Sequence, residues 1–309
     1  MNGKAASGGS EALRPARLLQ GGRPLKRWRY VGVFCEELMA CAALVQVGPV
    51  RQSFWAILTR ADGRLREHTR LFPRDGRLEL PAGTLAGDRN GGHARARVRA
   101  RVRPSGVSGP TSLAPPMPGR MIIRDRGVLL DLTLSEGAGV EARCRHGRGE
   151  VWTRKQAGVA ARGTVTLDRG PAREIHALAV IDDTAGYHAR HTEWWWSAGV
   201  GESPDGVQLA WNLVSGVNDP PHGSERAIWI DGSPQETAPV DFAADLSRIR
   251  CVDGSELRFE AEAERSRREN MLILSSEYRQ PFGVFSGALP GGIALARGLG
   301  VVEHHRARW

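Results

Sequence analysis

Hydrophobic and polar residues alternate along much of the chain, as they do in β-strands that bury one face. Within residues 207–214 every second position is apolar, and Trp211 falls on the opposite face from the polar Asn212. We find no segment of twelve or more residues with convincing helical apolar spacing, apart from residues 36–46, which fit a buried strand equally well. The pattern predicts a mainly β protein.

Asp-Gly dipeptides punctuate these predicted strands. Asp and Gly tolerate the positive φ angles of two-residue hairpin turns, so the dipeptide is a strong hairpin signal. Five such turns predict a mainly β, antiparallel fold. They are Asp62-Gly63, Asp75-Gly76, Asp205-Gly206, Asp231-Gly232 and Asp253-Gly254.

The length of 309 residues exceeds the usual size of a single core, which favours two domains. We expect a disordered leader over residues 1–22, because this stretch is polar and rich in Gly, Ala and Ser. We divide the rest into an N-terminal β domain at 23–160 and a C-terminal β domain at 161–309. The segment 105–120 is rich in Pro, Gly and Ser and is predicted to be a long loop.

The composition is that of an ordinary globular protein, with 41% hydrophobic and 25% charged residues. The net charge of +9 does not favour nucleic acid as a partner, because almost every cation is arginine and the skew is typical of codon bias. In the stretch from Arg95 to Arg103 arginines alternate with small apolar residues. This Arg ladder predicts either an anion-binding strand or a solvated strand face.

The four cysteines form no CxxC pair and no metal-ligand spacing, so we interpret them as reduced core thiols. The first twenty residues lack the apolar stretch of a signal peptide, and no apolar run approaches transmembrane length. We therefore expect a cytoplasmic protein without a transmembrane segment. Walker, GxGxxG and GxSxG motifs are also missing, which argues against a nucleotidase, a dinucleotide oxidoreductase and a serine hydrolase, and we predict no cofactor.

The block Tyr187–Trp196 contains three tryptophans, two histidines, a tyrosine and a carboxylate. Aromatic faces supply rigid apolar walls, while imidazole and carboxylate hold or move protons, so the mixture suits a pocket for a mostly apolar molecule with one polar end. On a strand Trp194 and Trp196 share one face and Trp195 takes the other. The predicted partner is a lipophilic small molecule.

Several polar residues in the second half are candidates for this pocket. Asp183 and His191 are our candidate proton donors. Asp182 and Asp183 point in opposite directions on a strand, so only one of them can face the pocket. The candidate ligand-binding residues are Tyr187, His188, Trp194, Trp196, Asn212, Asn218, Glu225, Glu303 and His304. The histidines lack a compact zinc signature, so we predict no metal site.

A series of motifs resembles a bacterial family known as domain of unknown function 2804, from about residue 24 to the C-terminus. One departure from the family pattern is Ser224-Glu225-Arg226, which stands where a Glu-Asn pair is expected. The matching segments are Lys26–Phe34, His191–Gly199, Trp211–Asn218, Trp229–Gly232, Gln280–Gly287 and Gly300–His304.

More remotely, the chain is similar to the lipocalin-like superfamily of carotenoid hydratases and tocopherol cyclase. That similarity implies two tandem lipocalin-like β-barrels or half-barrels holding an apolar ligand. Our leading hypothesis is a binder of a lipophilic molecule. The alternative is a cofactor-free hydratase, isomerase or cyclase that acts on a lipophilic alkene by acid catalysis. A third hypothesis is anion or nucleic-acid binding through the Arg ladder.

Overall fold

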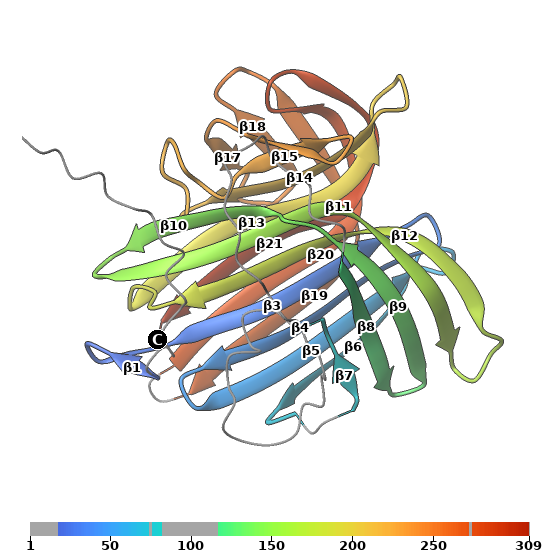
Figure 1. Cartoon of the computed structure of the whole chain (residues 1–309), viewed down its shortest axis with the longest axis horizontal. Helices are drawn as coiled ribbons and strands as arrows, with labels where there is room; N and C mark the ends of the chain where they lie inside the picture. Colours follow the sequence, from blue (N-terminus) through green and yellow to red (C-terminus); the bar gives the residue numbers. More distant parts are fainter. Residues whose placement is uncertain (1–17, 74–75, 82–116, 272–273, 309) are drawn as a thin grey trace, which may run out of the picture.

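The computed structural model describes residues 18–73, 76–81, 117–271 and 274–308. Antiparallel strands make up most of these residues, and the prediction of a mainly β, antiparallel fold is confirmed. Two large sheets, each curled into a half-barrel, dominate the molecule (Figure 1). Among the described residues, no helix has the length and apolar character needed to cross a bilayer.

The first sheet is built from the N-terminal part of the chain in the order β6-β5-β4-β3-β12-β11-β9-β8-β7, and β10 pairs with β11. Its strands are β3 (Lys26–Phe34), β4 (Leu38–Val47), β5 (Val50–Thr59), β6 (Arg64–Leu71), β7 (Leu78–Glu79), β8 (Met117–Asp125), β9 (Val128–Glu136), β10 (Val140–His146), β11 (Gly149–Leu167) and β12 (Arg173–Gly186). Residues 36–46, which fitted helix and strand alike, lie mostly in β4. A short hairpin of β1 (Leu19–Gln20) and β2 (Arg23–Pro24) precedes the sheet.

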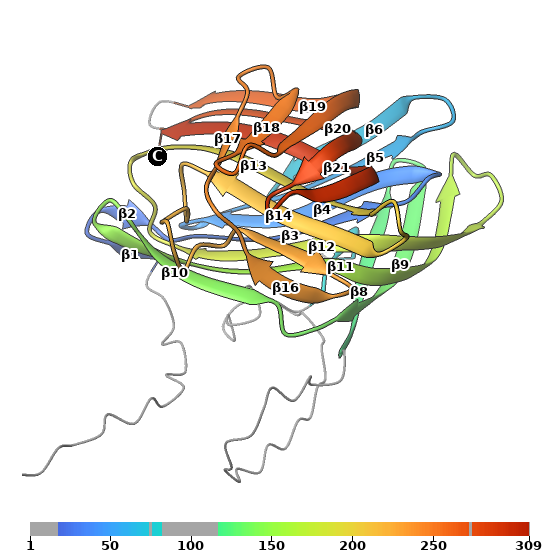
Figure 2. The same ribbon diagram turned by 90° about the horizontal axis from the view of Figure 1, so that it is seen from above.

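The second sheet follows the order β16-β15-β14-β13-β21-β20-β19-β18-β17. Its strands are β13 (His191–Glu202), β14 (Gln208–Ser215), β15 (Ala227–Ile230), β16 (Ser233–Glu236), β17 (Val240–Phe242), β18 (Arg248–Cys251), β19 (Glu256–Met271), β20 (Leu274–Leu289) and β21 (Ile293–Arg308). The sheets lie against each other, with β3 and β12 next to β21 and β13 (Figure 2).

Three hydrophobic cores follow from the alternation of side chains along the strands. One fills the space between the sheets and includes Phe34, Ala198 and Phe282. The face of β3 that is turned away from the second sheet contributes Val31 to a second core, which lies within the first half-barrel. The face of β14 that is turned away from the first sheet contributes Trp211 to a third core, which lies within the second half-barrel. Each sheet therefore buries both faces over part of its area.

A β-bulge in β11 changes which face its side chains occupy. The register shifts between Ala157 and Val159, and the intervening Gly158 has a φ angle of +73°, which glycine adopts without steric cost. Ala157 consequently belongs to the core between the sheets, whereas Val159 belongs to the core of the first half-barrel. One strand thus serves two cores.

The Asp-Gly turns behave as predicted where they are described. Asp231 and Gly232 join β15 to β16 as a two-residue hairpin, with φ angles of +46° and +77°. The dipeptides at 62–63, 205–206 and 253–254 also connect paired neighbouring strands. Asp75 lies outside the described residues.

The domain limits drawn from composition differ from the sheet limits. The boundary at 160/161 falls inside β11, and the chain passes from the first sheet to the second only between Gly186 and His191. Of the expected leader, residues 18–22 belong to the β1–β2 hairpin, and residues 1–17 lie outside the described residues. Of the expected loop at 105–120, residues 117–120 begin β8. The Arg ladder also lies outside the described residues.

Candidate functional site

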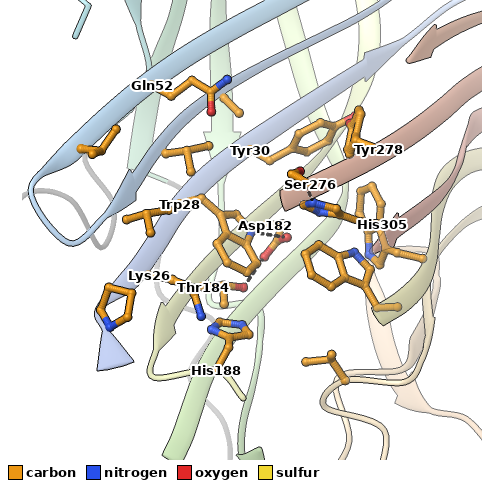
Figure 3. Close-up of a pocket in the computed structure, with 18 of the residues that line it drawn as sticks. Lys26, Trp28, Tyr30, Gln52, Asp182, Thr184, His188, Ser276, Tyr278 and His305 are labelled. Carbon is orange, nitrogen blue, oxygen red and sulfur yellow. Dashed lines mark hydrogen bonds between the residues drawn. The ribbon is translucent and has the colours of Figure 1, made fainter. Parts of the chain in front are cut away.

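A cavity of about 890 Å³ lies between the two sheets. The first sheet lines it with β3, β4, β5, β11 and β12, and the second with β13, β14, β19, β20 and β21. Its volume falls within the range of pockets that hold small molecules in proteins. Aromatic rings from both sheets form much of its wall, as part of the lining in Figure 3 shows.

The period of two along the strands places these rings. On β3, Lys26, Trp28 and Tyr30 occupy alternate positions and all line the cavity. On β13, Trp194 and Trp196 line it, whereas Trp195 faces away. The prediction that Trp195 takes the opposite face from Trp194 and Trp196 is confirmed.

Rings from opposite sheets contact one another around the cavity. Trp28 stacks on Trp194, with centroids 6.2 Å apart and an angle of 10° between the planes. Tyr30 packs edge-on against Trp196 at a centroid distance of 5.4 Å. Such geometries stabilise aromatic pairs beyond the area that they bury. The rings are therefore held in fixed orientations.

The first polar centre of the cavity is Asp182, on β12. Its carboxylate accepts hydrogen bonds from the Trp28 indole N–H at 2.9 Å and from the Thr184 hydroxyl at 2.8 Å. Lys155 places its ammonium 2.6 Å from the same carboxylate. These contacts, part of which Figure 3 shows, leave Asp182 rigidly oriented at the wall of the cavity.

Lys155 joins Asp182 to a second carboxylate. Its Nζ lies 3.1 Å from Glu225, which also accepts a 2.8 Å hydrogen bond from the Asn218 amide. Burial disfavours the charged ammonium, but the two carboxylates outweigh this effect and raise the pKa of Lys155. Burial raises the pKa of Glu225. The result is a buried triad of one cation between two acids.

Glu303, on β21, is the second polar centre. One oxygen accepts a 2.8 Å hydrogen bond from the Trp194 indole N–H, and the other accepts a 2.8 Å bond from the Gln280 amide. The Cys41 thiol in turn contacts the Gln280 carbonyl oxygen at 3.7 Å. Despite these donors, burial raises the pKa of Glu303 to about 7. A carboxyl group with this pKa can both donate and accept a proton near neutral pH.

Two histidines line the cavity, His188 buried and His305 half-buried. His305 shares a 2.9 Å hydrogen bond with the Ser276 hydroxyl, and burial lowers its pKa to about 3. His188 packs against the Trp28 ring at 5.3 Å, and burial holds its pKa well below the usual value. Both imidazoles are therefore neutral at physiological pH.

The structure gathers most of the ligand-binding candidates around the cavity. Its lining includes His188, Trp194, Trp196, Asn218, Glu225 and Glu303. Asn212 lies directly behind the wall, where its amide accepts a 2.7 Å hydrogen bond from Trp196 and donates to the Glu225 backbone. Tyr187 is half-buried and does not line the cavity.

Asp183 lies on the opposite face of β12 from the cavity. It is buried, and its carboxylate pairs with Arg29 at 2.8 Å. Only one of the two adjacent aspartates was expected to face the pocket, and this residue is Asp182. The candidate Asp183 lies outside the cavity because alternation along β12 turns its side chain toward the first half-barrel.

His191 and His304 also lie away from the cavity. His191 is exposed at the start of β13. The His304 ring stacks on Trp195 at 4.7 Å and contacts Glu193 at 2.9 Å, on the opposite face of β21 from Glu303. Within the described part of the chain, no group of three or more His, Cys, Asp or Glu side chains is placed to hold a metal ion.

Several lining residues escaped the sequence analysis. His305 and Tyr278 could have been found from strand alternation, since they lie two positions from Glu303 and Gln280. Trp28 and Tyr30 belong to the Lys26–Phe34 motif, but they were not assigned to the pocket because this motif is far along the chain from the block Tyr187–Trp196. Lys155 gave no local signal, because its role depends on one carboxylate from β12 and another from the loop before β15.

Comparisons with known proteins identify a sequence family and solved structures that are similar to this chain. The family model Domain of unknown function (DUF2804) matches residues 11–309. A crystal structure of a candidate AttH protein from Nitrosomonas europaea aligns with a TM-score of 0.53 and 14% identity, over 97% of this chain and 98% of that one. Kievitone hydratase from Nectria haematococca aligns with a TM-score of 0.49 and 11% identity, over 90% and 88%. Among curated proteins, no sequence matches.

Proposed function

Because the chain belongs to the DUF2804 family, whose name assigns no activity, we propose a function from the site itself: the protein binds a lipophilic small molecule between its two sheets. The observation that supports this is the cavity of about 890 Å³ walled by aromatic rings from both sheets. Binding sites of small apolar molecules combine such walls with a few fixed polar groups.

The polar groups indicate a ligand that is not a pure hydrocarbon. Asp182 and Glu303 face the cavity, and their partners Trp28, Thr184, Trp194 and Gln280 fix their orientation. Fixed polar groups in an apolar pocket orient a ligand and select among similar shapes. We therefore expect a mainly apolar molecule with at least one oxygen function.

Mass spectrometry of an organic extract from the natively purified protein tests this proposal. The extract is compared with those of Trp194→Leu, which removes a cavity ring, and Trp195→Leu, which removes a neighbouring ring on the other face. A lipophilic compound retained by the wild type and Trp195→Leu but lost from Trp194→Leu supports the pocket. Equal retention by all three proteins places the compound elsewhere and contradicts the proposal.

A second candidate function is acid catalysis on a lipophilic alkene, as in a hydratase, isomerase or cyclase. The observation that favours it is Glu303, whose burial raises its pKa to about 7 beside the indole faces of the cavity. A buried acid near neutrality suits proton transfer to carbon, and aromatic faces stabilise a developing cation. In this proposal Glu303 takes the role first given to Asp183 and His191.

The retained compound also tests catalysis. Wild-type protein converts it to a product in a mass-spectrometric time course, whereas Glu303→Gln binds it with similar affinity and turns it over at least about 100-fold more slowly. Equal rates for the two proteins would exclude Glu303 as the proton donor and leave the binding proposal standing.

A further inference from the structure

Neither of two tyrosine hydroxyls at the cavity makes a hydrogen bond of normal geometry with the described residues, although Tyr30 interacts with Cys41, and Tyr278 interacts with Glu303 and Arg265. Tyr30 comes from β3 of the first sheet and Tyr278 from β20 of the second. The hydroxyl oxygens of both are buried. An unsatisfied buried hydroxyl costs about 1–3 kcal/mol, so two of them at one cavity indicate a group that they bind.

The hydroxyls lie near each other and near Glu303. The labelled side chains of Tyr30 and Tyr278 approach one another from the two sheets in Figure 3. Burial, followed by the neighbouring Cys41, Tyr278 and Glu303, raises the pKa of Tyr30 well above its usual value. Burial and then Glu303 do the same for Tyr278. Both phenols therefore stay protonated and act as hydrogen-bond donors.

The rings that carry the hydroxyls are fixed by their packing. Tyr30 packs edge-on against Trp196. Tyr278 packs edge-on against His305 at 5.5 Å and lies under the Arg265 guanidinium at 4.9 Å. Donors held in place before the ligand arrives lose little entropy on binding and can stabilise a charge that develops during a reaction.

We propose that Tyr30 and Tyr278 together bind the carbonyl oxygen of a lipophilic ketone or enone, and that Glu303 moves a proton to and from the carbon next to that carbonyl. The inference rests on the proposed function, since the apolar part of the ketone occupies the same cavity. An sp² carbonyl oxygen accepts two hydrogen bonds at once, which matches two phenol donors.

The chemistry needs no further reactant. The Glu303 carboxylate takes a proton from the α-carbon, the C–H electron pair forms the enolate C=C bond, and the carbonyl π electrons move onto the oxygen held by the two phenols. The Glu303 carboxylic acid then returns its proton to the enolate, at the same carbon or, in a conjugated enolate, at the γ-carbon. The second outcome moves a double bond, so the substrate class is that of a carbonyl isomerase.

Two matched probes separate the proposals. 2-Acetylnaphthalene carries a carbonyl and exchangeable methyl protons, whereas 2-isopropylnaphthalene has the same number of heavy atoms and no oxygen. Affinity for each is measured by quenching of tryptophan fluorescence. Deuterium uptake into the acetyl methyl group of 2-acetylnaphthalene is followed in D₂O by mass spectrometry.

We expect the wild type to bind the ketone at least about tenfold more tightly than the hydrocarbon and to catalyse the exchange. Tyr30→Phe and Tyr278→Phe each lower ketone affinity about three- to tenfold and leave hydrocarbon affinity unchanged, which also shows that the variants fold. Glu303→Gln slows exchange at least about 100-fold. Tyr187→Phe, which changes the tyrosine outside the cavity, behaves as the wild type.

Each other outcome overturns a defined part of the proposal. Equal binding of the two probes, or a ketone preference that survives both Tyr→Phe changes, excludes the tyrosine pair and leaves the lipophilic pocket intact. Ketone preference without deuterium uptake excludes the proton transfer. Binding of neither probe contradicts the lipophilic pocket itself and the inference with it.

Discussion

Trp28 and Trp194 stack across the junction of the two sheets, with ring centroids 6.2 Å apart. Each indole N–H also donates to a different acid, Trp28 to Asp182 and Trp194 to Glu303. The pair therefore links the two polar centres through a single apolar contact. Changing either ring disturbs both the wall of the cavity and the orientation of one carboxylate.

Replacement of Trp28 by leucine weakens ligand binding. We expect Trp28→Leu to lower affinity for 2-isopropylnaphthalene about fivefold to tenfold, because an aromatic contact contributes about 1 kcal/mol beyond buried area. Trp152→Leu is the control, since Trp152 bonds Glu141 near the surface and does not line the cavity. Fluorescence titration measures both, and equal affinities for the two variants would remove Trp28 from the site.

Variants at the two adjacent aspartates, Asp182 and Asp183, distinguish an effect on ligand binding from an effect on stability. Asp183→Asn removes one of the two carboxylates that pair with the buried Arg29, the other being Glu136, so we expect the free energy of unfolding to fall by about 2 kcal/mol. Affinity for 2-acetylnaphthalene stays unchanged, because Asp183 faces away from the cavity. Asp182→Asn alters that affinity. Urea unfolding and fluorescence titration test the pair, and a loss of binding in Asp183→Asn would contradict the assignment.

Loss of the Lys155 charge destabilises the fold strongly. Lys155→Met leaves Asp182 and Glu225 buried without their shared cation, so we expect a loss of about 3–5 kcal/mol in urea unfolding. Adding Glu225→Gln to Lys155→Met recovers part of that loss. Arg268→Met breaks an exposed pair with Glu277 and costs less than about 1 kcal/mol. Similar losses for Lys155 and Arg268 would disprove the buried triad.

Glu303 makes stability depend on pH between about 4.5 and 7. Its pKa in the fold is about 7, above the ordinary value of 4.5, so the unfolded chain ionises first as pH rises. Stability is therefore highest below 4.5 with respect to this group, falls between 4.5 and 7, and is constant above 7. The total change is about 3 kcal/mol.

The control for this pH dependence is the Glu303→Gln variant, in which the side chain at position 303 does not ionise. The difference in unfolding free energy between the wild type and this variant, measured in urea from pH 4 to 8, falls by about 3 kcal/mol as pH rises. Any constant cost of placing an amide beside Gln280 cancels in this slope. A difference that does not change with pH would show that the Glu303 pKa is not raised.

Local patterns predicted the fold well. Alternation placed Trp194 and Trp196 on one face and set Asn212 opposite Trp211, as the structure has them. Asp-Gly turns predicted the antiparallel hairpins, and the family resemblance is confirmed over residues 11–309. These features depend on a period of two and on turn conformations, both of which are properties of neighbouring residues.

The site was less predictable, because it depends on contacts between distant strands. Alternation shows that Asp182 and Asp183 point apart but cannot say which face meets the second sheet. The bulge at Gly158 exchanges the faces of β11, so simple alternation along that strand misplaces Lys155 relative to Val159. Tyr30 and Tyr278 come from different sheets and meet only after the sheets dock.

The walls of the cavity belong to two sheets, and this has a thermodynamic consequence. A ligand held there acts as a reversible cross-link between the halves, since separating them abolishes its site. Binding therefore raises the free energy needed to open the junction, and this contribution grows with the ratio of the free ligand concentration to Kd. Saturating ligand should therefore make the two halves melt as one unit, coupling their cooperativity to the supply of a small molecule.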